Sequence, residues 1–161
     1  MNTNSHGSAS DMYDFDVPQP AGLYVNSSAA NGIIAVSGQL PFHEGALLHI
    51  GRVGEAVDQA QAEKAAAQCA VNALRVVRSS LGESWKMKAR VLRLSVFVAC
   101  ANGNVRIPAI ADAASRTLRD ALDERGVGAR TAIGVSHLPV NAPVEVELTI
   151  CSDPVERAVA G

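Results

Sequence analysis

The chain has 161 residues, of which 48% are hydrophobic, and this is enough for one domain with a buried core. Charged residues make up 19% and the formal net charge is -2, so overall charge gives no reason to expect a polyanionic partner or a membrane surface. The apolar runs fall short of the ~20 residues of a membrane-spanning helix, and the first residues lack a secretory signal. We therefore expect a soluble cytoplasmic protein.

Residues 1 to 18 are polar and show no hydrophobic periodicity, which predicts a flexible N-terminal arm outside the core. Residues 19 to 161 are then expected to form a single domain. The three cysteines, Cys69, Cys100 and Cys151, are odd in number and lie in apolar surroundings, so we expect buried, reduced thiols and no disulfide framework.

Short strands are expected in the first third of the domain. Residues 22 to 27 and 33 to 37 have strand-like patterns, and Asn31-Gly32 between them is typical of a two-residue hairpin turn. A further short strand is expected at residues 47 to 50.

The middle of the chain predicts two helices and a strand. Residues 58 to 81 have apolar positions three or four apart, which indicates an amphipathic helix that ends at Gly82. Residues 92 to 98 alternate as a central strand does. Pro108 suits the first turn of a second helix, and Gly126 follows its last apolar position.

Two closing strands, residues 130 to 138 and 143 to 151, complete an α+β pattern around one sheet. If they form a hairpin, Arg130 lies opposite residue 151, and Glu145 lies about 20 Å farther along the ladder. One small molecule could not contact both side chains within one chain. A ligand that uses both would have to bind at a boundary between two copies.

Arg130 and Glu145 are the side chains in these strands that could carry chemistry. Arg130 shares its strand face with small residues, and a guanidinium stays charged and binds a carboxylate through two parallel hydrogen bonds. A structural salt bridge is the alternative interpretation of Arg130. Glu145 and Glu147 share a strand face, where carboxylates are usually only solvated.

The closing segment GARTAIGVSHLPVNAPVEVELTI, with VSGQLP, NAL and VFV earlier in the chain, resembles the Rid (YjgF-like) family of enamine/imine deaminases over about residues 20 to 152. The resemblance implies a chorismate-mutase-like α+β fold, in which two helices pack on one face of a mixed, largely antiparallel sheet. It also implies a homotrimer with ligand clefts between subunits. No metal or organic cofactor is expected.

The resemblance also implies site residues. Arg130 matches the arginine that holds the substrate carboxylate, and Glu145 matches the glutamate that positions the hydrolytic water. Tyr24, Ser37 and Gly38 fall where the family has further substrate-binding positions. Tyr24 could instead be a strand aromatic, and Ser37 a turn residue.

The implied reaction is hydrolysis of a 2-imino acid, formed from a 2-enamino acid such as 2-aminoacrylate, to a 2-keto acid and ammonia. Ala132 departs from the pattern, because many members have cysteine there, and the arm and the loop at residues 42 to 54 resemble a longer branch of the family. One alternative is a protein that binds small carboxylates without turnover. Another is action on RNA, for which the basic stretch at residues 75 to 93 is the local support.

Overall fold

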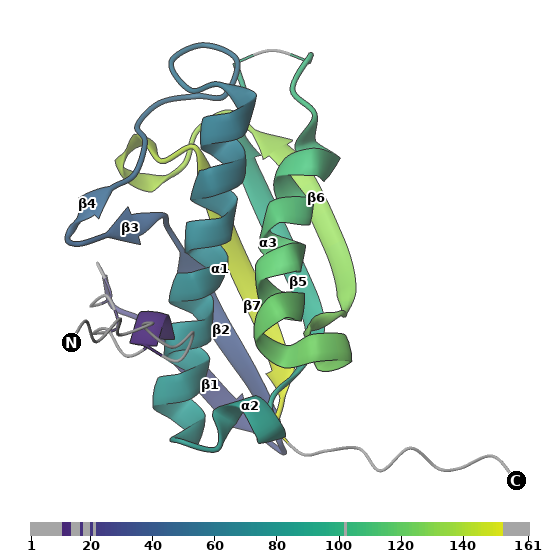
Figure 1. Cartoon of the computed structure of the whole chain (residues 1–161). Helices are drawn as coiled ribbons and strands as arrows, with labels where there is room; N and C mark the ends of the chain where they lie inside the picture. Colours follow the sequence, from purple (N-terminus) through teal and green to yellow (C-terminus); the bar gives the residue numbers. More distant parts are fainter. Residues whose placement is uncertain (1–10, 14–16, 18–19, 21, 102, 153–161) are drawn as a thin grey trace, which may run out of the picture.

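A computed structural model of the chain describes residues 11–13, 17, 20, 22–101 and 103–152. Its two main helices, α1 (Gln59–Leu81) and α3 (Ile107–Leu122), lie side by side on one face of a five-stranded sheet (Figure 1). This confirms the expected α+β architecture. Among the described helices, none has both the length and the apolar composition that crossing a membrane requires.

The sheet is mixed and largely antiparallel, with the strand order β1-β2-β7-β5-β6. Each neighbouring pair is antiparallel except β5 and β6, which are parallel. The strands are β1 (Ser27–Ala30), β2 (Ile33–Gln39), β5 (Arg90–Ala99), β6 (Ala129–Val135) and β7 (Val144–Cys151). The smaller elements are β3 (Phe42–His43), β4 (Ala46–Leu47), α2 (Trp85–Lys88) and the 3-10 turns η1 (Asp11–Tyr13), η2 (Asp123–Gly126) and η3 (Pro139–Asn141).

Local signals set the ends of α1. The carboxylate of Asp58 accepts a hydrogen bond from the backbone N–H of Gln61, and the side chain of Gln61 accepts one from the backbone N–H of Asp58. This capping box satisfies two N–H groups that a helix start leaves without partners. At the other end Gly82 has φ 72, a conformation that glycine adopts without steric cost. The predicted bounds of this helix are confirmed.

The core lies between the sheet and the two helices. The inward side chains of β7 are fully or almost fully buried, and those of β5 pack beside them. From α3 the core receives the predicted stripe of Ala111, Ala114, Leu118 and Leu122. Cys69 is buried in this layer, whereas Cys100 and Cys151 are only partly buried.

The Asn31-Gly32 turn is confirmed, because β1 and β2 pair antiparallel on either side of it. Both turn residues have positive φ, 50 and 76, as the tight hairpin turn requires. The first strand itself begins at Ser27, so the prediction of a strand over residues 22 to 27 is wrong. That segment is a loop, and it carries Tyr24.

The prediction of a hairpin between the two closing strands is also wrong. β5 lies between β6 and β7 and pairs with both. The chain from β5 through α3 to β6 forms a crossover unit, which places β6 parallel to β5 at the edge of the sheet. β7 then fills the centre, where its alternating apolar side chains meet the helices.

Tyr13 lies in the segment expected to be a flexible arm, yet its side chain is buried. Its ring makes an edge contact with Trp85, at 5.3 Å between centroids. Arg75 of α1 donates a hydrogen bond to the carbonyl of Met12 (3.0 Å), and Arg78 donates one to the carbonyl of Tyr13 (3.2 Å). Placing Tyr13 outside the core was therefore wrong. Residues 1–10, 14–16 and 18 of the expected arm lie outside the described residues, and their flexibility stays a prediction.

We expect Tyr13→Ala to lower the free energy of unfolding by about 3 kcal/mol, because it removes a buried aromatic ring. Trp85 is the only tryptophan of the chain and touches this ring, so its fluorescence should shift toward that of a solvated indole. Urea unfolding followed by fluorescence measures both effects. Tyr24→Ala is the matched control, since that tyrosine is 52% exposed, and equal losses for the two variants would contradict the docking of residue 13.

Candidate functional site

A β-bulge brings three of the predicted site residues together. β2 and β7 pair regularly up to Val36 and resume at Gln39, so that Ser37 and Gly38 together oppose Glu147. Bulges of this kind redirect side chains and are frequent beside active sites. The buried side chain of Gln39 donates a hydrogen bond to the carbonyl of Ser37 (3.0 Å) and so holds the bulge in shape.

Gly38 makes room for the carboxyl group of Glu145. A Cβ atom at position 38 would overlap Oε1 of Glu145, and the Cδ atom of that side chain would lie only 2.7 Å from it. Any other residue at position 38 would force the carboxyl group of Glu145 to move, so Gly38 is what permits this position of the carboxyl group. The structure thus brings together Gly38 and Glu145, two residues predicted from separate segments.

Glu145 is half-buried on the face of the sheet opposite to α1 and α3. Burial raises the pKa of its carboxyl group, and the negative charge of Glu147, two residues along the same face, raises it further. A carboxyl group that binds its proton more tightly than usual can take a proton from water and return it later.

The loop that carries Tyr24 is attached to the same bulge. The hydroxyl group of Ser37 donates a hydrogen bond to the carbonyl of Val25 (2.7 Å), and its backbone N–H bonds to the carbonyl of Asn26 (2.9 Å). Ser37 is therefore a strand residue that anchors this loop. Tyr24 directly precedes Val25 in this loop and is 52% exposed, so it is not the strand aromatic considered as its alternative.

A shallow groove of about 360 Å³ runs along the open face beside the bulge. Ser37 and Glu147 line it from one side, and Arg93 and Ser95 of β5 line it from the other. Arg93 donates a hydrogen bond to the hydroxyl group of Thr131 on β6 (2.9 Å). Arg93 thus lies on the same face as the two glutamates, and sequence reasoning did not single it out.

Arg130 lies elsewhere, on the edge strand β6, and its side chain turns toward α3. Its Nη1 atom is 2.7 Å from Oδ1 of Asp112 and 3.1 Å from Oγ of Ser115. The salt bridge considered as the alternative interpretation is therefore present. The side chains of Arg130 and Asp112 are 28% and 53% exposed, and exposed ion pairs contribute only about 0–1 kcal/mol to stability.

Arg130 and Glu145 cannot touch one small ligand within a single chain. In the sheet register Arg130 pairs with Leu94 of β5, and Leu94 pairs with Leu148 of β7. Leu148 is three residues from Glu145. The two backbones are therefore about 10 Å apart along the strands and about 10 Å apart across two strand spacings. Their side chains also point to opposite faces, since Arg130 meets α3 and Glu145 lies on the open face.

The basic stretch at residues 75 to 93 does not form one surface. Arg75 is buried and Arg78 bonds to η1, whereas Arg93 lies on the far face of the sheet. Lys86 lies over the rings of Tyr13 and Trp85, at 5.3 and 5.5 Å from their centroids. Contacts inside the fold thus account for Arg75, Arg78, Lys86 and Arg93.

Asp112 and Ser115 are polar partners of Arg130 that sequence reasoning missed. Their spacing of three places both on one side of α3, toward β6, but only the crossover that sets β6 beside β5 shows which strand they face.

Across the described residues there is no cluster of three or more histidine, cysteine or acidic side chains that could hold a metal ion.

We expect Gly38→Ala to lower the free energy of unfolding by about 1–3 kcal/mol, because the new methyl group must displace the carboxyl group of Glu145. The loss should be smaller in a Glu145→Ala background, where that group is absent, and urea unfolding of the four proteins gives the coupling. Gly103→Ala is the control, because a Cβ atom there meets nothing within 4 Å. Equal losses in both backgrounds would show that the two positions do not interact.

Comparison with known proteins gives consistent matches. Residues 15–151 match the family model described as Endoribonuclease L-PSP. Protein TCP17 of Trypanosoma cruzi is 31% identical over 132 residues, which are 81% of this chain and 82% of that protein. A crystal structure of a protein of unknown function from Agrobacterium tumefaciens is 36% identical, with a TM-score of 0.79, over 89% of this chain and 94% of that one.

A more distant structure shows the same fold. E. coli TdcF with bound serine has a TM-score of 0.61 at 17% identity and covers 84% of this chain and 92% of its own. At that identity the likeness concerns the fold alone. The family match spans most of the chain, and the relatives from Trypanosoma cruzi and Agrobacterium tumefaciens are identical to it at 31% and 36% of the aligned residues. The chain therefore belongs to the Endoribonuclease L-PSP family.

Proposed function

We propose that this protein hydrolyses 2-imino acids, of the kind formed from 2-aminoacrylate, to 2-keto acids and ammonia, as members of the Rid branch that it resembles do. The observation that carries the proposal is the carboxyl group of Glu145, held over Gly38 at a bulge with its pKa raised by burial. This is a proton-transferring group on a hollowed face, without a metal ligand set beside it in the described chain.

The reaction needs little beyond that group. Water adds to the carbon of the protonated imine, and its proton passes to the Glu145 carboxylate, which gives a carbinolamine. The protonated Glu145 returns a proton to the amine nitrogen, and the C–N bond breaks with its electron pair going to nitrogen. Ammonia leaves, the hydroxyl group becomes the ketone as it loses its proton to Glu145, and solvent takes that proton.

Arg130 would hold the carboxylate of the substrate. Both of its described hydrogen bonds use Nη1, to Asp112 and to Ser115, so the two protons of that nitrogen are committed. Within the described chain the Nε and Nη2 atoms of Arg130 have no partner. A guanidinium can bind a carboxylate side-on through these two atoms. The salt bridge then orients the guanidinium and leaves its binding edge available.

The complete site would lie between copies of the chain in a homotrimer. Arg130 and Glu145 point to opposite faces of one sheet, so Arg130 of one copy would meet Glu145, Tyr24 and the bulge of the next. None of the described helices covers the face that carries Glu145 (Figure 1), and this face exposes Ile133 at 46%, which leaves apolar surface for a second copy. Serine bound to TdcF shows that this fold holds a small carboxylate in that protein.

Arg130→Ala should reduce the catalysed rate of imine hydrolysis at least a hundredfold, because the substrate carboxylate loses its anchor. Imino acids generated in place by an amino-acid oxidase, with release of keto acid and ammonia, provide the assay. Arg52→Ala is the neutral control, since Arg52 pairs with Glu55 at the surface. Light scattering should give three times the mass of one chain for the parent and for both variants.

Arg93→Ala separates this site from one confined to a single chain. Arg93 shares the open face with the glutamates, so it would be the anchor if one copy held the whole ligand. Loss of activity in Arg93→Ala with full activity in Arg130→Ala would move the site to the groove on that face. A monomeric protein with full activity would equally contradict the shared cleft.

Glu145→Gln should lower kcat by about 10²–10⁴-fold while binding of a keto acid is retained, because the amide cannot take a proton. Glu145 must be ionised to accept that proton, and its pKa is raised, so parent activity should fall on the acid side at a pH above the ordinary value of 4.5. The variant should lack this limb in a profile of kcat/KM against pH. Glu44→Gln, at an exposed turn, is the control.

Two other functions are separated by the same variants. A protein that only binds carboxylates would show keto-acid binding that depends on Arg130, with no turnover in the parent. Ribonuclease action is favoured by the family description, and it would appear as RNA cleavage with steeply salt-dependent binding. Cleavage that persists in Glu145→Gln would place that activity outside the proposed site.

A further inference from the structure

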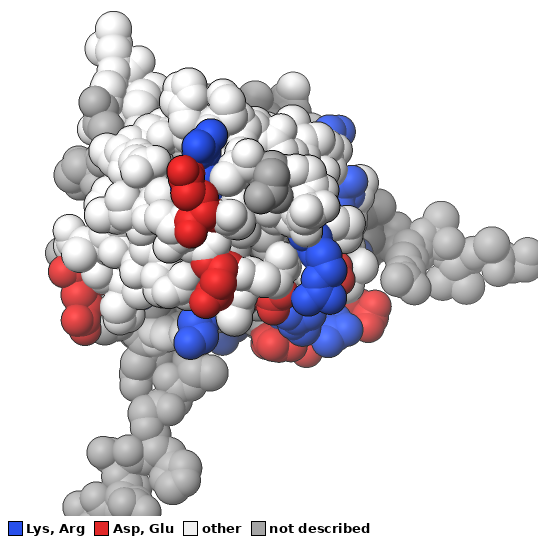
Figure 2. Space-filling model, turned by 90° about the horizontal axis from the view of Figure 1, so that it is seen from above, with Lys and Arg blue, Asp and Glu red and all other residues white. Residues whose placement is uncertain are grey.

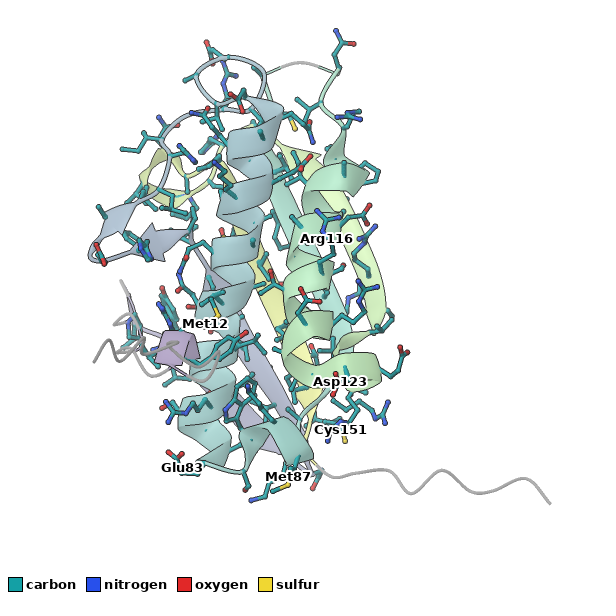
Figure 3. All side chains as sticks on the ribbon, in the orientation of Figure 1. Met12, Glu83, Met87, Arg116, Asp123 and Cys151 are labelled. Atoms are coloured by element: carbon teal, nitrogen blue, oxygen red, sulfur yellow. The ribbon has the colours of Figure 1, made fainter. Side chains whose placement is uncertain are left out.

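A second groove, separate from the bulge, lies between the outer side of α3 and the start of β6. Its volume is about 370 Å³, which is within the range of small-molecule sites. Asp112, Ser115, Arg116 and Arg119 line it from α3, and residues 126 to 128 line the other side. Figure 3 labels Arg116 on the part of α3 that lies beside β6. Arg130 adjoins the groove, because it bonds to two of its lining residues.

The ion pairing on α3 leaves two cations for this groove. Asp112 is four residues before Arg116, the spacing at which helix side chains usually pair. It pairs instead with Arg130 on β6. Among the described residues, Arg116 and Arg119 have no hydrogen bond or ion pair from their side chains. Asp112, the carboxylate that lines the groove, thus pairs with Arg130, which is not a lining residue. The guanidinium groups of Arg116 and Arg119 on the groove wall have no anionic partner among the described residues.

We propose that this groove binds a second anionic group of the substrate, so that the preferred substrates are 2-imino acids with an acidic side chain. The inference rests on the proposed function and adds a substrate class to it. The carboxylate next to the imine carbon would bind at Arg130, and the side-chain carboxylate would extend along α3 to Arg116 and Arg119. Neutral imino acids would use Arg130 alone.

The surface around the groove suits a small anion better than a nucleic acid. Seen from above, the basic side chains have acidic side chains beside them (Figure 2). The lining residues include no aromatic side chain on which a base could stack.

The test compares a neutral and an acidic imino acid, generated from alanine and from glutamate by the matching oxidases. For the double variant Arg116→Gln/Arg119→Gln we expect KM for the acidic imine to rise at least tenfold. For the neutral imine KM should stay within twofold, and kcat should be unchanged for both. Arg106→Gln, an exposed arginine at the start of the same helix, should change neither.

A binding measurement keeps this inference separate from the proposed function. Calorimetry with 2-oxoglutarate and with pyruvate should show that the double variant weakens binding of the first about tenfold and leaves the second unchanged. That result supports the groove even if the parent turns over neither imine. Equal affinities of parent and double variant for 2-oxoglutarate would overturn the inference. It would also be overturned if the double variant bound an RNA oligomer more weakly than the parent but bound 2-oxoglutarate equally well.

Discussion

The close approach of Glu145 to Gly38 is the contact on which the site depends. A carboxyl group can lie against the backbone of a strand only where no Cβ atom stands in its way, and the bulge at Ser37 and Gly38 creates that place. The same position removes part of the water around the carboxyl group, and its pKa rises for that reason. The irregular pairing of β2 with β7 therefore sets both the position of this carboxyl group and the burial that raises its pKa.

The crossover from β5 through α3 to β6 decides the rest of the geometry. It places Arg130 at the edge of the sheet and turns its side chain toward the helix, where Asp112 and Ser115 hold one of its nitrogen atoms. The salt bridge was the alternative to a role in ligand binding, yet it occupies only part of the guanidinium. It also withdraws Asp112 from Arg116, so that one ion pair both orients Arg130 and leaves α3 with unpaired positive charge facing a groove.

The proposed homotrimer would bring together two halves of the site that lie on opposite faces of the sheet in one chain. A chain that carries its anchor at one edge and its proton-transferring group near the middle of the opposite face would complete the site only with a second copy. The sequence also predicted that one copy is insufficient, but from a hairpin that does not exist. The correct reason is that β5 separates the two strands and that the two side chains point in opposite directions.

The sequence by itself determined the features whose causes lie within a few residues: the Asn31-Gly32 turn, the capped ends of α1 and the alternation that puts Glu145 outward on β7. Each depends on local backbone preference or on side-chain period. The tertiary structure alone decided the order of the strands, the burial of Tyr13 against Trp85 and the pairing of Arg130 with Asp112. These contacts join segments that are distant in the chain, so which of several chemically suitable partners is met depends on the packing of the whole fold.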